Sequence, residues 1–180
     1  MPRWRTTLGA LGILALVGAC STAPPEVQMT SDKPSMTVTS DAFTDGGAIP
    51  RRFSCDGAGE VPSLSWQGTP ADVAAQAVVV DDPDAPRGTF THWVVLDLPP
   101  GLRTLTGGSL PSGVPEAKNS GGRTGWYPPC PPSGTHRYRF TVYALKRPTG
   151  LRDGAPLDAA LRAISADAVA WGRITGTYSR

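Results

Sequence analysis

Three apolar segments rich in β-branched residues constrain the fold of this chain more than any other feature. They cover residues 76–81, 92–98 and 137–145. The first is wholly apolar at its centre, as in a strand that is buried on both faces. The third alternates basic with aromatic or apolar residues, which is the period of a strand. The 21 glycines and 19 prolines are spread between such segments, so we expect many turns and not disorder.

Shorter patterns complete the expected secondary structure. Strands are predicted at 36–40, 64–66 and 174–178. Apolar residues recur at helical spacing at 157, 161 and 164, which predicts a short helix, and residues 166–171 either continue it or form a second one. Strands dominate this order and helices come late. The sequence therefore predicts a mainly β fold, with an antiparallel β-sandwich-like core and short peripheral C-terminal helices.

Length and charge exclude several classes of protein. The 180 residues suit one domain. Of the 17 basic residues, Arg3 and Arg5 lie in residues 1–20, which contain no acid, so 15 basic residues face 15 acidic ones in the rest of the chain. Nucleic-acid binding depends on clustered Lys and Arg and is not expected. No cofactor and no metal is expected either.

Residues 1–20 have the features of a secretory signal. A short basic start precedes an apolar run at 8–19, which is shorter than the roughly 20 residues of a membrane span. The run ends in VGAC at 17–20, which resembles the bacterial lipobox, in which the cysteine is lipidated. A plain signal peptide with an incidental cysteine is the alternative. We favour lipidation of Cys20 because it directly follows the small residues Gly18 and Ala19, where a signal peptidase would cleave.

Lipidation would place the protein outside the cytoplasm, held at the cell membrane by its anchor. Residues 21–35 contain three prolines and are expected to form a flexible tether. Residues 36–180 are expected to form the folded domain. Each buried CH₂ of an acyl chain adds ~0.8 kcal/mol of membrane affinity, so two or three chains hold such a domain firmly.

Two cysteines remain in the exported part, Cys55 and Cys130. An oxidising compartment favours a disulfide between them, and closing a loop of this length stabilises a fold by roughly 4 kcal/mol. Two separately buried thiols are the alternative. A zinc site is disfavoured because the chain has no Cys-x-x-Cys pair.

Two proline-rich segments contain the two histidines of the chain. The first proline segment is DDPDAP at 81–86, and His92 follows it at the start of a strand. The second proline segment is YPPCPPSGTHRY at 127–138, and it contains His136. Proline restricts φ, so both segments are expected to be stiff and to lose little entropy when a ligand binds.

These segments resemble the two signatures of the phosphatidylethanolamine-binding protein family, in its bacterial, Raf kinase inhibitor-like branch. CDG at 55–57, PSLSW at 62–66 and GTYSR at 176–180 add to the resemblance, which covers residues 36–180. The family implies a central antiparallel sheet packed on a second sheet, and a small pocket for phosphate-like anions. Carried over by residue, the pocket would use Asp82, Asp84, Pro86, His92, Pro132, His136 and Tyr138.

One segment departs from the family pattern. WYPP stands at 126–129, where the family commonly has Gly-Gly-Pro before the second proline pair. Proline lacks the N–H group that glycine offers an anion. We therefore expect a pocket rim that is tighter, more aromatic and weaker for phosphate.

The charged residues of the two segments constrain one another. His92 and His136 are expected to form the cationic side of the pocket, with anion binding that strengthens as the pH falls from about 8 to 6. Asp82 and Asp84 would repel an anion unless they orient the histidines or accept loop N–H groups. The alternative is that the aspartates are turn caps and the histidines structural. Arg137 lies on the solvent face or pairs with one of these aspartates.

Three functions compete. The leading hypothesis is a membrane-anchored binding protein for small anions, phospholipid headgroups or similar small amphiphiles. The second is an inhibitor of a peptidase or kinase-like partner protein, which only the family resemblance supports. The third is a hydrolase that uses Ser133, His136 and an aspartate. It is disfavoured because G-x-S-x-G and H-E-x-x-H are absent from the sequence. No catalytic residue is assigned, and an enzyme is not expected.

Overall fold

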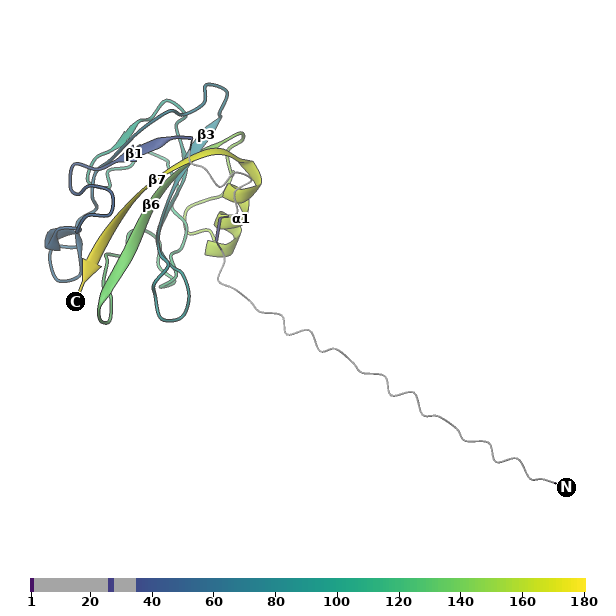
Figure 1. Cartoon of the computed structure of the whole chain (residues 1–180). Coiled ribbons are helices and arrows are strands. Elements are labelled where there is room, and N and C mark those ends of the chain that lie inside the picture. The colour runs from purple at the N-terminus through teal and green to yellow at the C-terminus, as the bar shows by residue number, and fades with distance from the viewer. Residues whose placement is uncertain (2–25, 28–34) are drawn as a thin grey trace.

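The computed structural model describes Met1, residues 26–27 and residues 35–180. Its elements are β1 (Thr37–Thr39), η1 (Arg51–Phe53, a 3-10 turn), β2 (Leu64–Gln67), β3 (Ala75–Asp82), β4 (Phe90–Leu98), β5 (Thr104–Leu105), β6 (Thr135–Leu145), α1 (Leu157–Asp167) and β7 (Ala168–Ser179). They form two antiparallel sheets, with strand orders β1-β2-β5 and β4-β3-β6-β7 (Figure 1). The predicted mainly β, sandwich-like core is confirmed.

The space between the two sheets contains the larger hydrophobic cluster. Trp66 of β2 and Phe140 of β6 are both buried there. A buried amide also joins the sheets: Gln76 of β3 accepts a hydrogen bond from Trp66 Nε1 at 2.7 Å and donates to the Pro99 carbonyl at 2.8 Å. A buried polar group with partners on both sides fixes the relative position of the elements that carry them.

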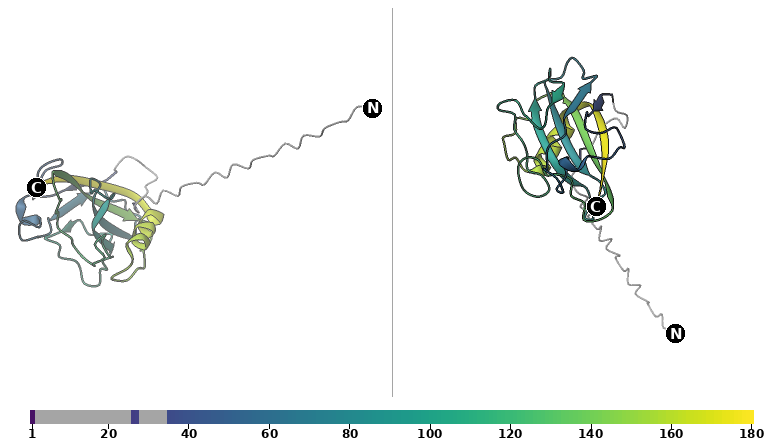
Figure 2. Two further views of the ribbon diagram at one scale, coloured as in Figure 1. Left: turned by 90° about the horizontal axis from the view of Figure 1, so that it is seen from below. Right: turned by 90° about the vertical axis from the view of Figure 1, so that its left-hand side faces the viewer.

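Helix α1 covers the other face of the four-stranded sheet, away from β1 (Figures 1 and 2). Leu161 and Ile164 of α1 are buried there, as their helical spacing predicts. Asp158 lies in the first turn, where a negative charge is favourable. No helix in the described part of the chain is both long and apolar enough to cross a membrane.

Residues 168–171 differ from both sequence-based alternatives, whereas 166 and 167 continue the helix. The helix ends at Asp167, and β7 begins at Ala168. Ala170 pairs with Ala144 of β6, and Trp171 pairs with Tyr143. Pairing with the long strand β6 outweighs the helical pattern, because tertiary context overrides local propensity. The helix in the C-terminal part of the described chain is therefore followed by a strand, and neither a longer helix nor a second one forms there.

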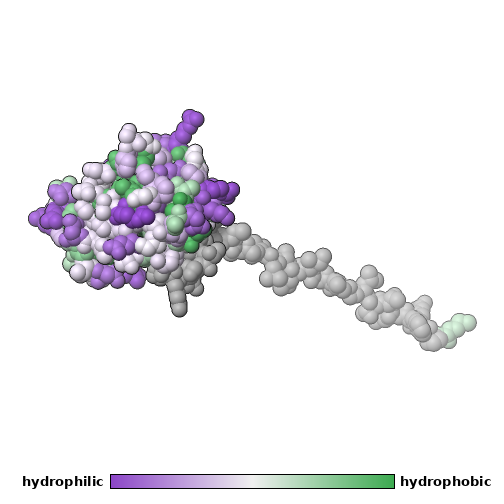
Figure 3. Space-filling view, turned by 90° about the horizontal axis from the view of Figure 1, so that it is seen from above, coloured by the Kyte–Doolittle hydropathy of each residue, from purple (hydrophilic) through white to green (hydrophobic). Residues whose placement is uncertain are grey.

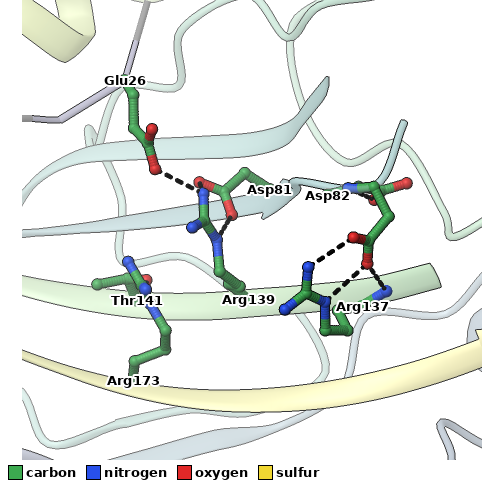
Figure 4. A network of polar contacts seen from close by, with 8 residues as sticks. Glu26, Asp81, Asp82, Arg137, Arg139, Thr141 and Arg173 are labelled. Atoms are coloured by element: carbon green, nitrogen blue, oxygen red, sulfur yellow. Dashed lines mark hydrogen bonds and ion pairs between the residues drawn. The ribbon is translucent and has the colours of Figure 1, made fainter. Parts of the chain in front are cut away.

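A polar network lies on the outer face of the four-stranded sheet. Figure 4 shows the guanidinium of Arg139 between the carboxylates of Asp81 and Glu26. Arg139 Nη2 donates to Asp81 at 2.9 Å and to Glu26 at 2.7 Å. Val27 packs against the cluster beneath α1. Glu26 and Val27 thus contact the domain, and the flexible tether expected for 21–35 stays a prediction. Cys20 and the rest of the predicted signal after Met1 lie outside the described residues.

The surface of the domain is mixed in character. On the face shown in Figure 3, hydrophobic residues form small areas between hydrophilic ones. Among residues 35–180, Val169 is the large hydrophobic residue with high exposure, at 53%. A mixed surface of this kind is ordinary for a protein in water.

Candidate functional site

The two proline segments meet at one end of the four-stranded sheet. Asp81, in the first, pairs with Arg139 just after the second, because β3 and β6 are neighbouring strands. The start of β4 lies on the other side of β3. These three strand ends surround a pocket of about 440 Å³. Six of the seven predicted binding residues line it: Asp82, Pro86, His92, Pro132, His136 and Tyr138.

Asp84 is the predicted residue that does not line the pocket. Its carboxylate accepts hydrogen bonds from Arg137, at 2.6 Å from Nη2 and 2.8 Å from Nε, and from the Arg137 backbone N–H at 2.9 Å. The guanidinium lowers the pKa of Asp84 to about 2. Both alternatives for Arg137 hold, since its side chain is 61% exposed and also paired. Asp84 therefore links the first proline segment to β6 through its hydrogen bonds and ion pair with Arg137.

Asp82 is buried beside His136. Its Oδ2 accepts a hydrogen bond from His136 Nδ1 at 2.7 Å, and its Oδ1 accepts the backbone N–H of Asp84 at 2.8 Å. Asp82 thus orients a histidine and accepts a loop N–H group, which are the two roles expected for the aspartates. An ionised carboxylate only accepts, so the hydrogen of this bond is on His136 Nδ1, and Nε2 is the ring nitrogen left for the pocket.

A β-bulge turns His92 into the pocket. Val80 of β3 pairs with Trp93, whereas its neighbour Asp81 pairs with Thr91. His92 is therefore the extra residue between two ladder pairs. Such a bulge re-aims a side chain, so His92 and Trp93 can both lie on the inner side of the sheet.

His92 is neutral near pH 7. Burial lowers its pKa to about 4 and outweighs the hydrogen bond between its Nδ1 and the Tyr127 carbonyl, at 2.7 Å. The expectation that His92 supplies a cation at mildly acidic pH is therefore wrong. The desolvation that changes this pKa follows from tertiary packing.

Aromatic rings form one wall of the pocket. The ring centroids of Phe90, Tyr138 and Tyr127 lie 4.8, 5.2 and 5.9 Å from that of His92. Tyr127 belongs to the segment that departs from the family pattern, and the Arg123 guanidinium lies 4.9 Å from its ring centroid. The aromatic rim expected from that segment is therefore present. The expected weakness for phosphate stays a prediction.

The hydroxyl group of Tyr138 is buried without a partner. Tyr138 is 0% exposed and lines the pocket, and its Oη has no hydrogen-bond partner among the described residues. The Cys130 backbone lies close enough to this oxygen to oppose the effect of burial on the pKa of Tyr138, but the hydroxyl hydrogen has no acceptor among the described residues. Burial raises the pKa of Tyr138, so the hydroxyl stays protonated. An unpaired buried polar group costs roughly 1–3 kcal/mol, which a ligand or water in the pocket would offset.

The second proline segment is linked by a disulfide to residues near η1, which in turn contact the end of β7. Cys55 and Cys130 form a disulfide, with an S–S distance of 2.04 Å, as favoured from the sequence. Asp56 accepts a hydrogen bond from the Tyr178 hydroxyl at 2.8 Å and forms an ion pair with Arg180 at 3.2 Å. The CDG and GTYSR motifs therefore meet beside the pocket.

Six other residues line the pocket and were not among the predicted ones: Ala85, Arg87, Phe90, Tyr127, Cys130 and Pro131. All of them lie within or close to the two proline segments. Their position beside the predicted site residues is the sequence signal that could have identified them. Ser133 is exposed and outside the pocket lining, and in the described part of the chain no hydrogen bond joins it to His136. Among the described residues, no group of three or more His, Cys, Asp or Glu is placed to hold a metal ion.

Comparisons with known proteins match most of the chain. The family model "Phosphatidylethanolamine-binding protein" matches residues 39–179. The chain is 39% identical to LppC of Mycobacterium tuberculosis, a protein named as a lipoprotein, over 97% of this chain and 96% of that one.

Two solved structures have the same fold. One is a phosphatidylethanolamine-binding protein homologue from Chlamydia trachomatis, with a TM-score of 0.76 and 33% identity over 82% of this chain and 99% of the other. The second is YbcL of E. coli, with a TM-score of 0.76 and 30% identity over 81% of this chain and 99% of the other. The sequence, the fold and the pocket residues agree: the chain belongs to the phosphatidylethanolamine-binding protein family.

Proposed function

We propose that this protein is a membrane-anchored binding protein whose pocket holds a small phosphate-bearing headgroup. The observation that carries the proposal is that Tyr138 lines the pocket while its buried hydroxyl has no hydrogen-bond partner among the described residues. Arg87 also lines the pocket and supplies a permanent positive charge for an anion. The aromatic wall suits the apolar part of an amphiphile.

Binding is tested by titration calorimetry of the full-length protein in non-ionic detergent, with inorganic phosphate and with phosphoethanolamine at pH 6. A hydrogen bond to a charged group contributes on the order of 1.5–3 kcal/mol, so Tyr138→Phe should weaken binding by about tenfold or more. Tyr143→Phe is the matched control, because Tyr143 is a buried tyrosine of β6 in the cluster beneath α1. Equal affinity in wild type and Tyr138→Phe would contradict the proposal.

We assign binding to this pocket and no catalytic step. Ser133 is exposed and lies outside the pocket lining, and in the described part of the chain no hydrogen bond joins it to His136. A serine-directed covalent probe should therefore leave Ser133 unlabelled. Labelling of Ser133 that depends on His136 would favour the hydrolase.

The anchor is the second part of the proposal. The VGAC sequence at 17–20 and the lipoprotein name of a relative that matches 97% of this chain support lipidation of Cys20. Cys20→Ala should abolish incorporation of labelled acyl chains and release or misprocess the protein. Acyl label retained in this variant, together with membrane fractionation, would rule the anchor out.

A further inference from the structure

The Nδ1 atoms of both pocket histidines are bound by groups that accept hydrogen bonds. The Tyr127 carbonyl binds His92 Nδ1 at 2.7 Å, and the Asp82 carboxylate binds His136 Nδ1 at 2.7 Å. A neutral imidazole has one donor nitrogen and one acceptor nitrogen. Because the hydrogen is on Nδ1, a neutral ring offers the pocket an acceptor at Nε2.

His92 stays in this state over the useful pH range. It is 4% exposed, and burial lowers its pKa to about 4. Above pH 5 its Nε2 therefore presents a lone pair to whatever occupies the pocket. A bare anionic oxygen also presents lone pairs, and two acceptors that face each other in a buried site leave both groups unsatisfied.

The protonation of a phosphate group decides whether it can satisfy this acceptor. A singly protonated monoester has one P–OH donor together with anionic oxygens, and its second pKa is about 6. A diester has no P–OH group. The hydroxyl of Tyr138, buried and unpartnered among the described residues, is a donor for one of the anionic oxygens.

We propose that His92 Nε2 accepts a hydrogen bond from the ligand, so that the pocket selects a singly protonated phosphate monoester over a phosphate diester. This inference rests on the proposed function. A soluble phosphomonoester and the headgroup of a phosphatidic acid present the same chemical group. His92 is thus a specificity-determining residue and not a cationic anchor.

Other ionisable groups surround His92. The test must separate the effect of their titration on binding from the effect of the ligand's own proton. The charges of Asp82 on β3 and His136 on β6 act on His92. The rings of Tyr138 on β6 and Tyr127 in the second proline segment contact the His92 ring. Arg87 lines the same pocket and does not change its charge with pH. Any titration of these protein groups affects every ligand with the same net charge alike, so a comparison between ligands isolates the ligand's own proton.

The first arm of the test compares two ligands that carry the same ammonium group. Phosphoethanolamine is a monoester and glycerophosphoethanolamine is a diester. Titration calorimetry of the full-length wild-type protein in detergent at pH 5.5 should show that the monoester binds about tenfold or more tightly, which corresponds to one satisfied acceptor. Equal affinities would overturn the inference and leave the proposed function standing. If neither ligand nor inorganic phosphate binds, the proposed function itself fails.

The second arm follows the ligand's proton between pH 5 and 8. The affinity for methyl phosphate should fall by about tenfold for each pH unit above its second pKa, near 6. Methylphosphonate has a higher second pKa, so its affinity should begin to fall at a higher pH. A decline at the same pH for both ligands would place the titrating group on the protein and overturn the inference.

A third arm identifies the source of the phosphate group. Short-chain phosphatidic acid in detergent micelles is compared with phosphoethanolamine at pH 5.5. Tighter binding of the lipid indicates a membrane source, and equal affinity indicates a soluble phosphomonoester; both results require the selectivity of the first arm. His92→Phe keeps a ring among the aromatic side chains but has no acceptor atom. It should bring the monoester-to-diester affinity ratio close to one, whereas an unchanged ratio would overturn the role of His92.

Discussion

Asp81 and Asp82 are neighbours at the end of β3, and their carboxylates face opposite sides of the sheet. Asp81 binds Arg139 in the outer network, whereas Asp82 binds His136 in the pocket (Figure 4 shows the outer side). Successive side chains of a strand alternate in this way. One strand end thus supplies both the outer polar network and the centre of the pocket.

Replacing Asp82 with asparagine should loosen this centre. The two carboxylate oxygens of Asp82 accept from two different donors, His136 Nδ1 and the Asp84 N–H. Asparagine has one oxygen, so one of the two donors loses its acceptor. We expect Asp82→Asn to lower the free energy of unfolding by roughly 1–3 kcal/mol, measured by urea denaturation, and to weaken phosphoethanolamine binding. Wild-type stability and affinity in this variant would show that Asp82 does not hold the ring.

The contact between Asp84 and Arg137 should make stability depend on pH in acid. The folded-state pKa of Asp84 is about 2, below the ordinary value of about 3.9, so the ionised carboxylate stabilises the fold above pH 4. This contribution is lost as the pH falls towards 2. Wild type should therefore be more stable than Asp84→Asn at pH 5, and the difference should shrink between pH 4 and pH 2. Urea denaturation at these pH values measures it, and a difference that is constant down to pH 2 would contradict the ion pair.

The disulfide should contribute strongly to stability, because Cys55 and Cys130 are 75 positions apart. On the chain-entropy model, removing it costs about 4 kcal/mol. The variant with both cysteines replaced by serine should lose about this much free energy of unfolding. A reducing agent should destabilise the wild type by a similar amount and leave the double variant unchanged. Two free thiols in the denatured, non-reduced wild type would rule the disulfide out.

The strands that form the site could be predicted from the sequence because their signal is local. The β-branched and apolar residues of 76–81 and 92–98 place β3 and β4 to within a few residues. The start of β7 could not, because Ala168 to Trp171 become a strand through pairing with β6. Strand β5 is two residues long and has no pattern of its own.

The residues of the pocket were easier to predict than their roles. Their place in two stiff segments at strand ends was visible in the sequence. The roles depend on geometry across the fold: His92 turns inward through a bulge, and Asp84 lies beyond the end of β3, where strand alternation no longer assigns a face. Burial, which sets the pKa of His92, is also a property of the folded chain.

The position of the ligand between the two proline segments is tested most directly by the imidazole ¹⁵N signals of the full-length protein in detergent micelles. The chain has two histidines, so the spectrum contains two rings. In the free protein at pH 6, His92 should show a protonated Nδ1 and an unprotonated Nε2. Addition of phosphoethanolamine should shift the Nε2 signals of both rings saturably, with the affinity found by calorimetry. Calorimetric binding that leaves both rings unchanged would place the ligand elsewhere on the protein.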